Sequence, residues 1–143
     1  MRTPTLEHLP EITSLLLESG LPTDDLPEQD LSLFRIEVPI ERLGAVGGLE
    51  RCADFALMRS VATAPAMRGR GFAGKIVEEL ERLAAEKGFR NLYLLTETAE
   101  RFFESKGYSA VDRSDVPAAI RESRQYSSLC PNSATVMCKK VGV

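Results

Sequence analysis

The sequence predicts an α+β fold in which helices flank one mixed central sheet of about six or seven strands. Three observations support this prediction. Apolar residues recur at helical spacing near the N-terminus and again in the middle of the chain. Between these segments, strand-like runs follow one another through short links, which is typical of an antiparallel meander. A continuous apolar run after the middle helix favours a central, parallel strand with both faces covered.

The sequence of the N-terminal part predicts a very short strand followed by two helices. Arg2–Pro4 ends the strand, and Thr5 is a candidate N-cap for a helix from Leu6 to Gly20. The apolar stripe of that helix consists of Leu9, Ile12, Leu15 and Leu16. His8 lies off the stripe, so we expect it to be an exposed surface residue. A polar turn then leads to a short helix around Asp25–Leu31.

The next elements are the strands of the meander. Phe34–Val38 alternates apolar and polar residues, and Leu43–Arg51 and Phe55–Ala62 follow after short turns. The second strand contains Gly44, Gly47 and Gly48. Glycines inside a strand indicate a bulge or the close approach of another backbone.

The middle helix begins near Gly71 and stops at Gly88, a fitting C-terminal glycine. Its apolar positions are Ala73, Ile76, Val77, Leu80, Leu83 and Ala84. The rest of the chain predicts, in order, a strand over Asn91–Thr96, a short helix over Thr98–Lys106, a strand over Tyr108–Val111, a helix over Val116–Arg124, a loop over Tyr126–Pro131 and a last strand over Ala134–Val141.

Length, charge and composition narrow the class of protein. A chain of 143 residues favours a single domain over residues 1–143. Its net charge of −3 gives no case for a nucleic-acid-binding surface. No apolar run approaches the roughly 20 residues that span a membrane, and acidic residues interrupt the region where a signal peptide would lie. We therefore expect a cytoplasmic protein without nucleic-acid or membrane partners.

The cysteines and the single histidine limit the chemistry. Cys52, Cys130 and Cys138 form an odd set without metal-ligand spacing, so we expect reduced thiols and no metal. With one histidine in the chain, we expect neither a histidine-based catalytic triad nor a His-rich metal site.

The stretch from Ser60 to Gly74 joins a strand to the middle helix through a loop rich in glycine and arginine. The first turn of a helix has N–H groups without intrahelical partners, and glycines let that backbone approach a phosphate. Arg68 and Arg70 add positive charge. The stretch therefore predicts an anion site, although an ordinary tight turn explains six residues with two glycines equally well. The sequences of the P-loop and of the dinucleotide fingerprint are absent.

The order Arg68-x-x-Gly71-x-Ala73 resembles the acetyl-CoA-binding loop of the GNAT N-acetyltransferase superfamily. A second region, Leu92–Thr96 followed by Phe102–Tyr108, resembles the second signature of that superfamily. Within it, the chain looks most like the arsenic-resistance-linked N-acetyltransferases. That closer likeness covers nearly the whole chain and is carried by Leu57–Ala62, Leu92–Glu100, Val116–Arg121 and Ser128–Ala134.

The resemblance implies a GNAT fold and acetyl-CoA as the co-substrate. It implies an N-acetyltransferase that acts on the amine of a small molecule, either amino-acid-like or an arsenical or other xenobiotic. Dimers are common in the superfamily, so a homodimer is one expectation. The alternative is a non-catalytic sensor of the same fold that binds an acyl-CoA or a metabolite.

The resemblance also assigns a cofactor site. The backbone of Val61, Ala62 and Thr63 would pair with the pantetheine arm like an added strand. The loop that would hold the pyrophosphate consists of Arg68, Gly69, Arg70, Gly71, Phe72, Ala73 and Gly74. Thr96 stands where the family often has a polar contact to the cofactor. The alternative for Thr96 is a strand-end residue that bonds the local backbone.

The sequence departs from the family at the usual acid and base. Phe103 replaces the Tyr that often serves as general acid, and Leu57 stands where some members have a Glu base. A backbone N–H near Val61 would stabilise the oxyanion.

Three residues are candidate replacements for the missing groups. Glu97 would accept the proton of the amine, or is a solvated or helix-capping carboxylate. Tyr126 would donate to the sulfur, or packs in the core. Arg59 would anchor a substrate carboxylate, or forms a salt bridge with a neighbouring Glu. Cys130 would suit trivalent arsenic, but a buried cysteine is the simpler interpretation.

Overall fold

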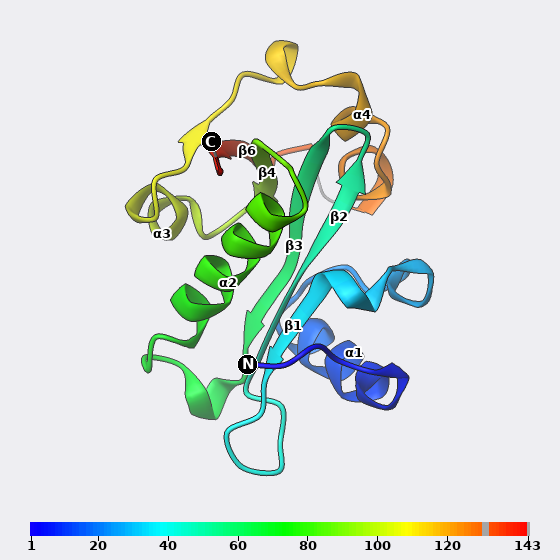
Figure 1. Cartoon of the computed structure of the whole chain (residues 1–143), viewed down its shortest axis with the longest axis vertical. Helices are drawn as coiled ribbons and strands as arrows, with labels where there is room; N and C mark the ends of the chain where they lie inside the picture. Colours follow the sequence, from blue (N-terminus) through cyan, green and yellow to red (C-terminus); the bar gives the residue numbers. More distant parts are fainter. Residues whose placement is uncertain (130–131, 143) are drawn as a thin grey trace.

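One six-stranded sheet organises the structure, a computed structural model that describes residues 1–129 and 132–142. The strand order is β1-β2-β3-β4-β6-β5 (Figure 1). The strands are β1 (Phe34–Glu37), β2 (Ala45–Cys52), β3 (Phe55–Thr63), β4 (Asn91–Thr96), β5 (Ser109–Ala110) and β6 (Thr135–Lys140). The α-helices are α1 (Leu9–Glu18), α2 (Phe72–Glu86), α3 (Glu100–Ser105) and α4 (Ala118–Arg121). The predicted mixed sheet with flanking helices is therefore confirmed.

Short turns of helix complete the chain. The 3₁₀ turns are η1 (Leu6–His8), η2 (Leu26–Glu28), η3 (Leu31–Leu33), η4 (Pro65–Met67) and η5 (Arg113–Asp115), and η6 (Gln125–Leu129) is a π-turn. In the described ranges, no helix is long and apolar enough to cross a lipid bilayer.

The sheet mixes antiparallel and parallel neighbours. The predicted meander is confirmed, because β1, β2 and β3 pair antiparallel in succession. β4 lies parallel to β3, and β6 pairs antiparallel with both β4 and β5. The parallel register joins only Ala56–Met58 to Leu92–Leu94, although β3 continues to Thr63 and β4 to Thr96. The two central strands are therefore paired at one end only.

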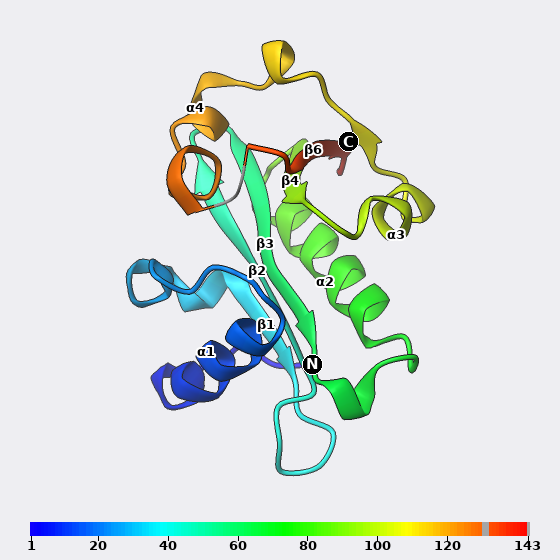
Figure 2. The ribbon, with the colours of Figure 1, turned by 180° about the vertical axis from the view of Figure 1, so that it is seen from behind.

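The two faces of the sheet are covered by different helices. α2 packs on one face through Ile76, Val77 and Leu80, against Met58 of β3 (Figure 1). α1 and α4 lie on the opposite face, as the view from behind shows (Figure 2). Leu57 faces α4, as alternation along a strand requires for the neighbour of Met58.

Several predicted elements differ from the observed ones. Arg2 forms only an isolated bridge with Ile36, so the predicted first strand is absent and the described sheet has six strands. The helix predicted around Asp25–Leu31 is a single 3₁₀ turn. The helix predicted over Val116–Arg124 is one α-turn after η5. Pro117 explains this break, because the residue before a proline is held in an extended conformation.

His8 also differs from its prediction as an exposed residue. Its side chain is half-buried, and Nδ1 accepts a hydrogen bond of 3.0 Å from the Thr5 N–H. Thr5 is the N-cap, as predicted, and His8 completes a reciprocal cap at the start of η1. The histidine therefore has a structural role at the first helical turn.

Two consecutive glycines allow β2 to sit between its neighbours. A Cβ on Gly48 would lie 2.5 Å from the ring of Phe34, and one on Gly47 would lie 2.9 Å from Leu80 and clash with Ile76. These distances are shorter than real Cβ contacts, so β2 can approach α2 and Phe34 this closely only because both positions are glycine. Of the two predicted reasons for these glycines, the bulge is confirmed by the register shift between Val46 and Gly48, whereas the atoms that approach Gly47 and Gly48 belong to side chains and not to another backbone.

We expect Gly47→Ala to lower the free energy of unfolding by about 1–3 kcal/mol, because the added methyl overpacks the contact with α2. Truncation of Ile76 should relieve part of this strain. In a double-mutant cycle with Ile76→Ala, measured by urea unfolding, the double variant should therefore be more stable than the sum of the single effects implies. Strict additivity would show that the two side chains do not compete for the same space.

Candidate functional site

A cavity of about 920 Å³ opens where β3 and β4 separate. One wall is β3 from Met58 to Thr63, and another is the end of β4 with the residues that follow it, Leu94–Ala99. The loop after α1, Ser19–Asp24, closes a third side, and Gln125 and Ser128 of η6 close a fourth. The cavity therefore combines segments that are far apart in the sequence.

The β3 wall contains a bulge. Val46 pairs with Ala62 and Gly48 pairs with Arg59, so two residues of β3, Ser60 and Val61, lie opposite the single residue Gly47. Ser60 has φ +59°, a left-handed conformation that costs a non-glycine residue about 1–3 kcal/mol unless its surroundings hold it. On the β4 side, residues 59–63 have no strand partner in the described part of the chain. The backbone there is free to pair with an extended ligand.

A glycine loop leads from β3 to α2 at the same end of the sheet. Gly69 has φ +79° and Gly71 has φ +78°, and Gly71 is the N-cap of α2. The Lys75 N–H donates to the Gly71 carbonyl at 3.1 Å. The N–H groups of residues 72–74 precede this bond, in the turn where a helix provides no acceptors. The arrangement suits an anion.

The predicted cofactor residues fall into two groups. Those that line the cavity are Val61, Ala62, Thr63, Arg68, Ala73 and Thr96. Those that lie beside it, on the exposed loop or the first turn of α2, are Gly69, Arg70, Gly71, Phe72 and Gly74. Arg68 Nε donates to the Thr63 carbonyl at 3.3 Å, so this side chain folds back over the mouth of the cavity. The structure thus brings the two groups together around one helix start.

Gly74 contributes to this arrangement because it has no side chain. A Cβ on Gly74 would lie 3.1 Å from Lys106 Nζ, so the glycine leaves room for an ammonium beside the first turn of α2. Lys106 also lies over the ring of Phe102, with Nζ 5.7 Å from the centroid.

The end of β4 supplies two polar side chains to the cavity. Thr96 Oγ1 accepts a hydrogen bond of 3.0 Å from the Ala99 N–H, which is the local backbone bond considered as its alternative role. Glu97 is exposed and lines the cavity opposite β3. An exposed carboxylate at the mouth of a cavity has access to both solvent and ligand.

Arg59 lines the cavity, but its guanidinium is already bonded to two carboxylates. Its guanidinium donates two bonds of 2.5 Å to the carboxylate of Asp25 and one of 2.8 Å to Glu50. Arg59 is 3% exposed and Asp25 is 1% exposed. The structure therefore contains the salt bridge that the sequence left open as an alternative, with Asp25 as an additional and bidentate partner.

The ion pair sets the ionisation of its members. Burial opposes the charge on Asp25, but the hydrogen bonds and the charge of Arg59 outweigh it and hold the pKa of this carboxyl below its ordinary value. Burial likewise disfavours the charged guanidinium, but Asp25 and Glu50 raise the pKa of Arg59. Both groups are therefore charged at neutral pH.

Tyr126 and Leu57 do not line the cavity. Tyr126 packs in the apolar cluster under α4, and the Arg113 guanidinium lies 5.0 Å from its ring centroid. Tyr126 does not line the cavity, so the structure does not bring it together with Glu97. Leu57 is buried on the α4 face. Cys130 lies outside the described residues.

Phe103 does reach the cavity, from α3. It is buried, lines the cavity and packs edge-on against Tyr108 with 5.6 Å between ring centroids. The residue that the sequence analysis compared with the family's usual Tyr therefore brings an apolar ring to the cavity. The described free cysteines, Cys52 and Cys138, do not line the cavity, and burial raises the pKa of the Cys52 thiol to about 11.

Sequence reasoning missed several residues that build the site. Asp25 binds Arg59, and Gln125 is buried and lines the cavity. The loop Ser19–Asp24 also borders the cavity. None of these positions has a periodic or motif signal, because each is brought to β3 only by tertiary packing.

Comparisons with known proteins place this geometry among acetyltransferases. A sequence model of the acetyltransferase (GNAT) domain matches residues 30–110. The chain superimposes on N-acetylglutamate synthase from Neisseria gonorrhoeae, complexed with coenzyme A and N-acetyl-glutamate, with a TM-score of 0.84 and 18% identity over 98% of this chain and 34% of that chain. It superimposes on Rv2747 from Mycobacterium tuberculosis, in complex with CoA, with a TM-score of 0.83 and 21% identity over 98% of both chains.

A curated relative supports the same family over a shorter span. The chain is 40% identical over 52 residues to mouse N-alpha-acetyltransferase 80, a match that covers 36% of this chain and 17% of the mouse protein. The chain thus spans a small part of that relative and about a third of the Neisseria enzyme, at 34%.

The buried ion pair predicts acid sensitivity. Because the pKa of Asp25 is lowered on folding, the unfolded chain binds the proton first, and stability is lost as the pH falls below the ordinary Asp value of about 4. We expect urea midpoints to fall between about pH 5 and pH 3. Asp25→Asn should flatten this slope and cost about 3–5 kcal/mol at pH 7, since Arg59 loses its bidentate partner.

Asp30→Asn is the matched control for this measurement. The pKa of exposed Asp30 is also lowered, by hydrogen bonds from Ser32, but no buried charge depends on it. A loss in Asp30→Asn equal to that in Asp25→Asn would contradict the assignment to the buried pair.

Proposed function

The chain belongs to the GNAT acetyltransferase family, and from this premise we propose that it transfers the acetyl group of acetyl-CoA to the amine of a small molecule. One observation carries the proposal. The edge of β3 that has no strand partner among the described residues and the glycine-capped start of α2 meet at one cavity. An extended ligand with a phosphate end needs both features, one for its arm and one for its charge.

The residues present fit such a ligand. In our assignment, the N–H groups at the start of α2, together with Arg68 and Arg70, bind the diphosphate. The backbone of Val61–Thr63 pairs with the pantetheine arm, since this edge has no strand partner in the described ranges. Thr96 already accepts the Ala99 N–H, so its hydroxyl hydrogen and its second lone pair serve the ligand.

The chemistry requires little from the protein beyond positioning and one proton acceptor. A neutral amine attacks the thioester carbonyl, a C–N bond forms, the C–S bond breaks, and coenzyme A leaves as a thiolate. We assign the oxyanion contact to the Val61 N–H at the bulge. We assign the proton of the amine to Glu97, directly or through a water. A thiolate leaves without much help near neutral pH, which is compatible with Phe103 in place of a tyrosine.

The predicted roles of Arg59 and Tyr126 are not part of the proposed reaction as the sequence analysis gave them. Arg59 directs its fork at Asp25 and Glu50, so we do not assign it as the main anchor of a substrate carboxylate. A donor role for Tyr126 stays a prediction, and its packing against Arg113 gives the residue a structural purpose without it.

The acceptor class rests on the resemblance noted in the sequence. An amino-acid-like amine and an arsenical or other xenobiotic amine are the two candidates. The complex of the Neisseria enzyme with coenzyme A and N-acetyl-glutamate supports the first candidate by analogy of fold. We therefore propose an amino-acid-like amine as the first acceptor to test, and an amine-bearing arsenical as the second.

We expect Gly71→Glu to abolish acetyl-CoA binding. The substitution places a carboxylate beside the diphosphate, and a like-charge pair at about 4 Å costs about 4 kcal/mol near a protein surface, or roughly a thousandfold in affinity. Titration calorimetry measures the effect. Gly71→Asn is the matched control, because asparagine tolerates φ +78° and adds no charge. Unchanged affinity in Gly71→Glu would rule out this placement of the diphosphate.

We expect Glu97→Gln to lower kcat by roughly 10²–10⁴-fold, the usual contribution of a general base, while acetyl-CoA affinity is retained. Release of free thiol with a panel of amines is the assay. Glu100→Gln, on the neighbouring helix α3 and outside the cavity lining, is the control and should keep activity. Tight cofactor binding with no thiol release from any amine over a wide pH range would favour the sensor alternative.

A further inference from the structure

A buried polar cluster lies directly behind the bulge of β3. Besides its bonds to Asp25 and Glu50, Arg59 donates from Nε to Ser60 Oγ at 3.2 Å. Asp25 also accepts a bond of 3.2 Å from Gln29 Nε2. Asp25 belongs to the N-terminal segment, where it is the N-cap of η2. The cluster therefore ties that segment to one point on the central strand.

Stability alone does not account for this cluster. Removing two charges from water costs several kcal/mol, and replacing a buried ion pair by apolar groups of similar size is often neutral or stabilising. Neighbouring positions in both segments are apolar, since Leu26 and Leu57 are fully buried. An apolar contact between Asp25 and Arg59 positions would therefore serve folding at least as well.

The location of the cluster indicates a different purpose. Arg59 immediately precedes Ser60, whose left-handed backbone is costly unless the surroundings hold it. Ser60 and Val61 are the residues without a β2 partner, and both line the cavity. A fork fixed at both ends on Asp25 restrains rotation of the strand at this point more than a single contact does.

We propose that Arg59 and Asp25 form a positioning pair that holds the β3 bulge so that the Val61 N–H meets the carbonyl oxygen of the thioester. Neither side chain touches the acetyl group; both act through the backbone of residues 60 and 61. The inference rests on the proposed function, because it needs a thioester at the bulge. It explains why a buried charge pair lies beside the cavity.

The pair predicts a specific difference between two ligands. Acetyl-CoA has the carbonyl oxygen that the Val61 N–H would meet, and free coenzyme A lacks it. One hydrogen bond contributes about 0.5–1.5 kcal/mol, so wild-type protein should prefer acetyl-CoA by roughly 2- to 10-fold. This preference is measurable by titration calorimetry without knowledge of the acceptor amine.

The test is a triple variant, Asp25→Leu, Glu50→Gln and Arg59→Met, which removes the cluster without leaving a buried charge. Its urea midpoint should be close to wild type, its affinity for coenzyme A should change less than about twofold, and its preference for acetyl-CoA should fall to about 1. Arg59→Lys keeps the charge but loses the fork, so its preference should be intermediate. This single variant also serves if the triple variant does not fold.

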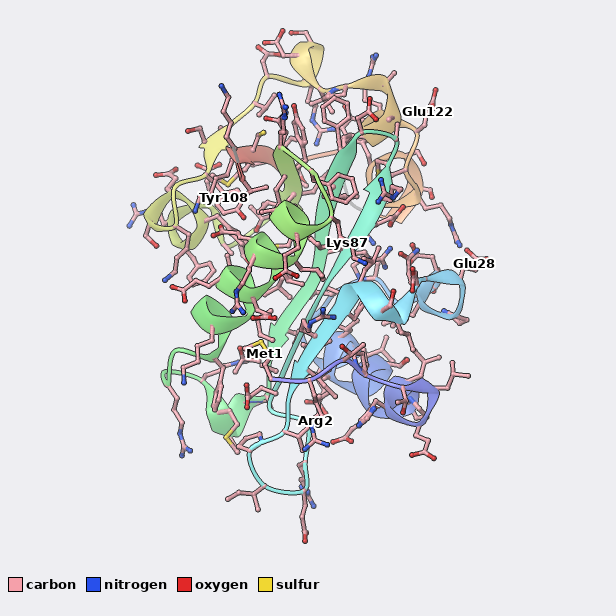
Figure 3. The ribbon with its side chains drawn as sticks, viewed as in Figure 1. Met1, Arg2, Glu28, Lys87, Tyr108 and Glu122 are labelled. Carbon is pink, nitrogen blue, oxygen red and sulfur yellow. The ribbon has the colours of Figure 1, made fainter. Side chains whose placement is uncertain are left out.

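The exposed ion pair between Arg124 and Glu28 provides the control. Arg124 Nη1 lies 2.9 Å from Glu28 Oε2, and Glu28 is labelled in Figure 3. The double variant Arg124→Ala, Glu28→Ala should keep the wild-type preference.

A cluster-free variant that retains the preference, or that loses affinity for both ligands equally, would overturn the positioning role. So would a wild-type protein that binds both ligands alike. Failure of wild type to bind coenzyme A at all would instead contradict the proposed function, and the inference with it.

Discussion

The limited pairing of the two central strands is the constraint on which the rest of the structure depends. Parallel bonding between β3 and β4 ends after Met58 and Leu94, while both strands continue. The divergence leaves backbone groups of β3 without a strand partner in the described residues, and unpaired backbone groups need another ligand or water. It also opens the cavity between the two strands. The cavity is thus a consequence of how the sheet is built, and the loop Ser19–Asp24 and η6 close its other sides.

Each neighbouring element stabilises this open geometry from a different side. α2 packs along β2 and β3 on one face, and its glycine cap directs its first turn toward the cavity. α1 packs on the other face against β1 and β2. At the far side of the sheet, Glu81 of α2 accepts bonds from Tyr108 and Lys139, which fixes α2 relative to β6. The separated strands are therefore held apart by packed helices on both faces.

The elements that the sequence predicts well are those with local signals. The apolar positions of α2 recur at helical spacing, and Ile76, Val77 and Leu80 are all fully buried. Gly71 and Gly88 bound that helix, and both have left-handed backbones that explain the choice of glycine. The glycine-arginine loop is recognisable for the same reason, because its chemistry lies in consecutive residues.

The remainder depends on contacts between distant segments. Asp25 and Arg59 are 34 positions apart, and no motif or periodic pattern near either residue predicts that the two will pair. The sequence predicts a short helix around Asp25, but the segment forms a single 3₁₀ turn in which Asp25 and Leu26 are buried. Tyr126 packs against the apolar cluster under α4, which is one of the two roles that the sequence left open for it.

The glycine pair in β2 has a consequence for the descent of this chain. Gly47 lies against Ile76 and Leu80, and Gly48 lies against the ring of Phe34, so neither position has room for a methyl group. Substitution of either glycine is therefore tolerated only after the side chain that contacts it, on α2 or β1, has been replaced by a smaller one. Among natural variants, these positions should change in concert, and a lineage that keeps the large partners stays locked to both glycines.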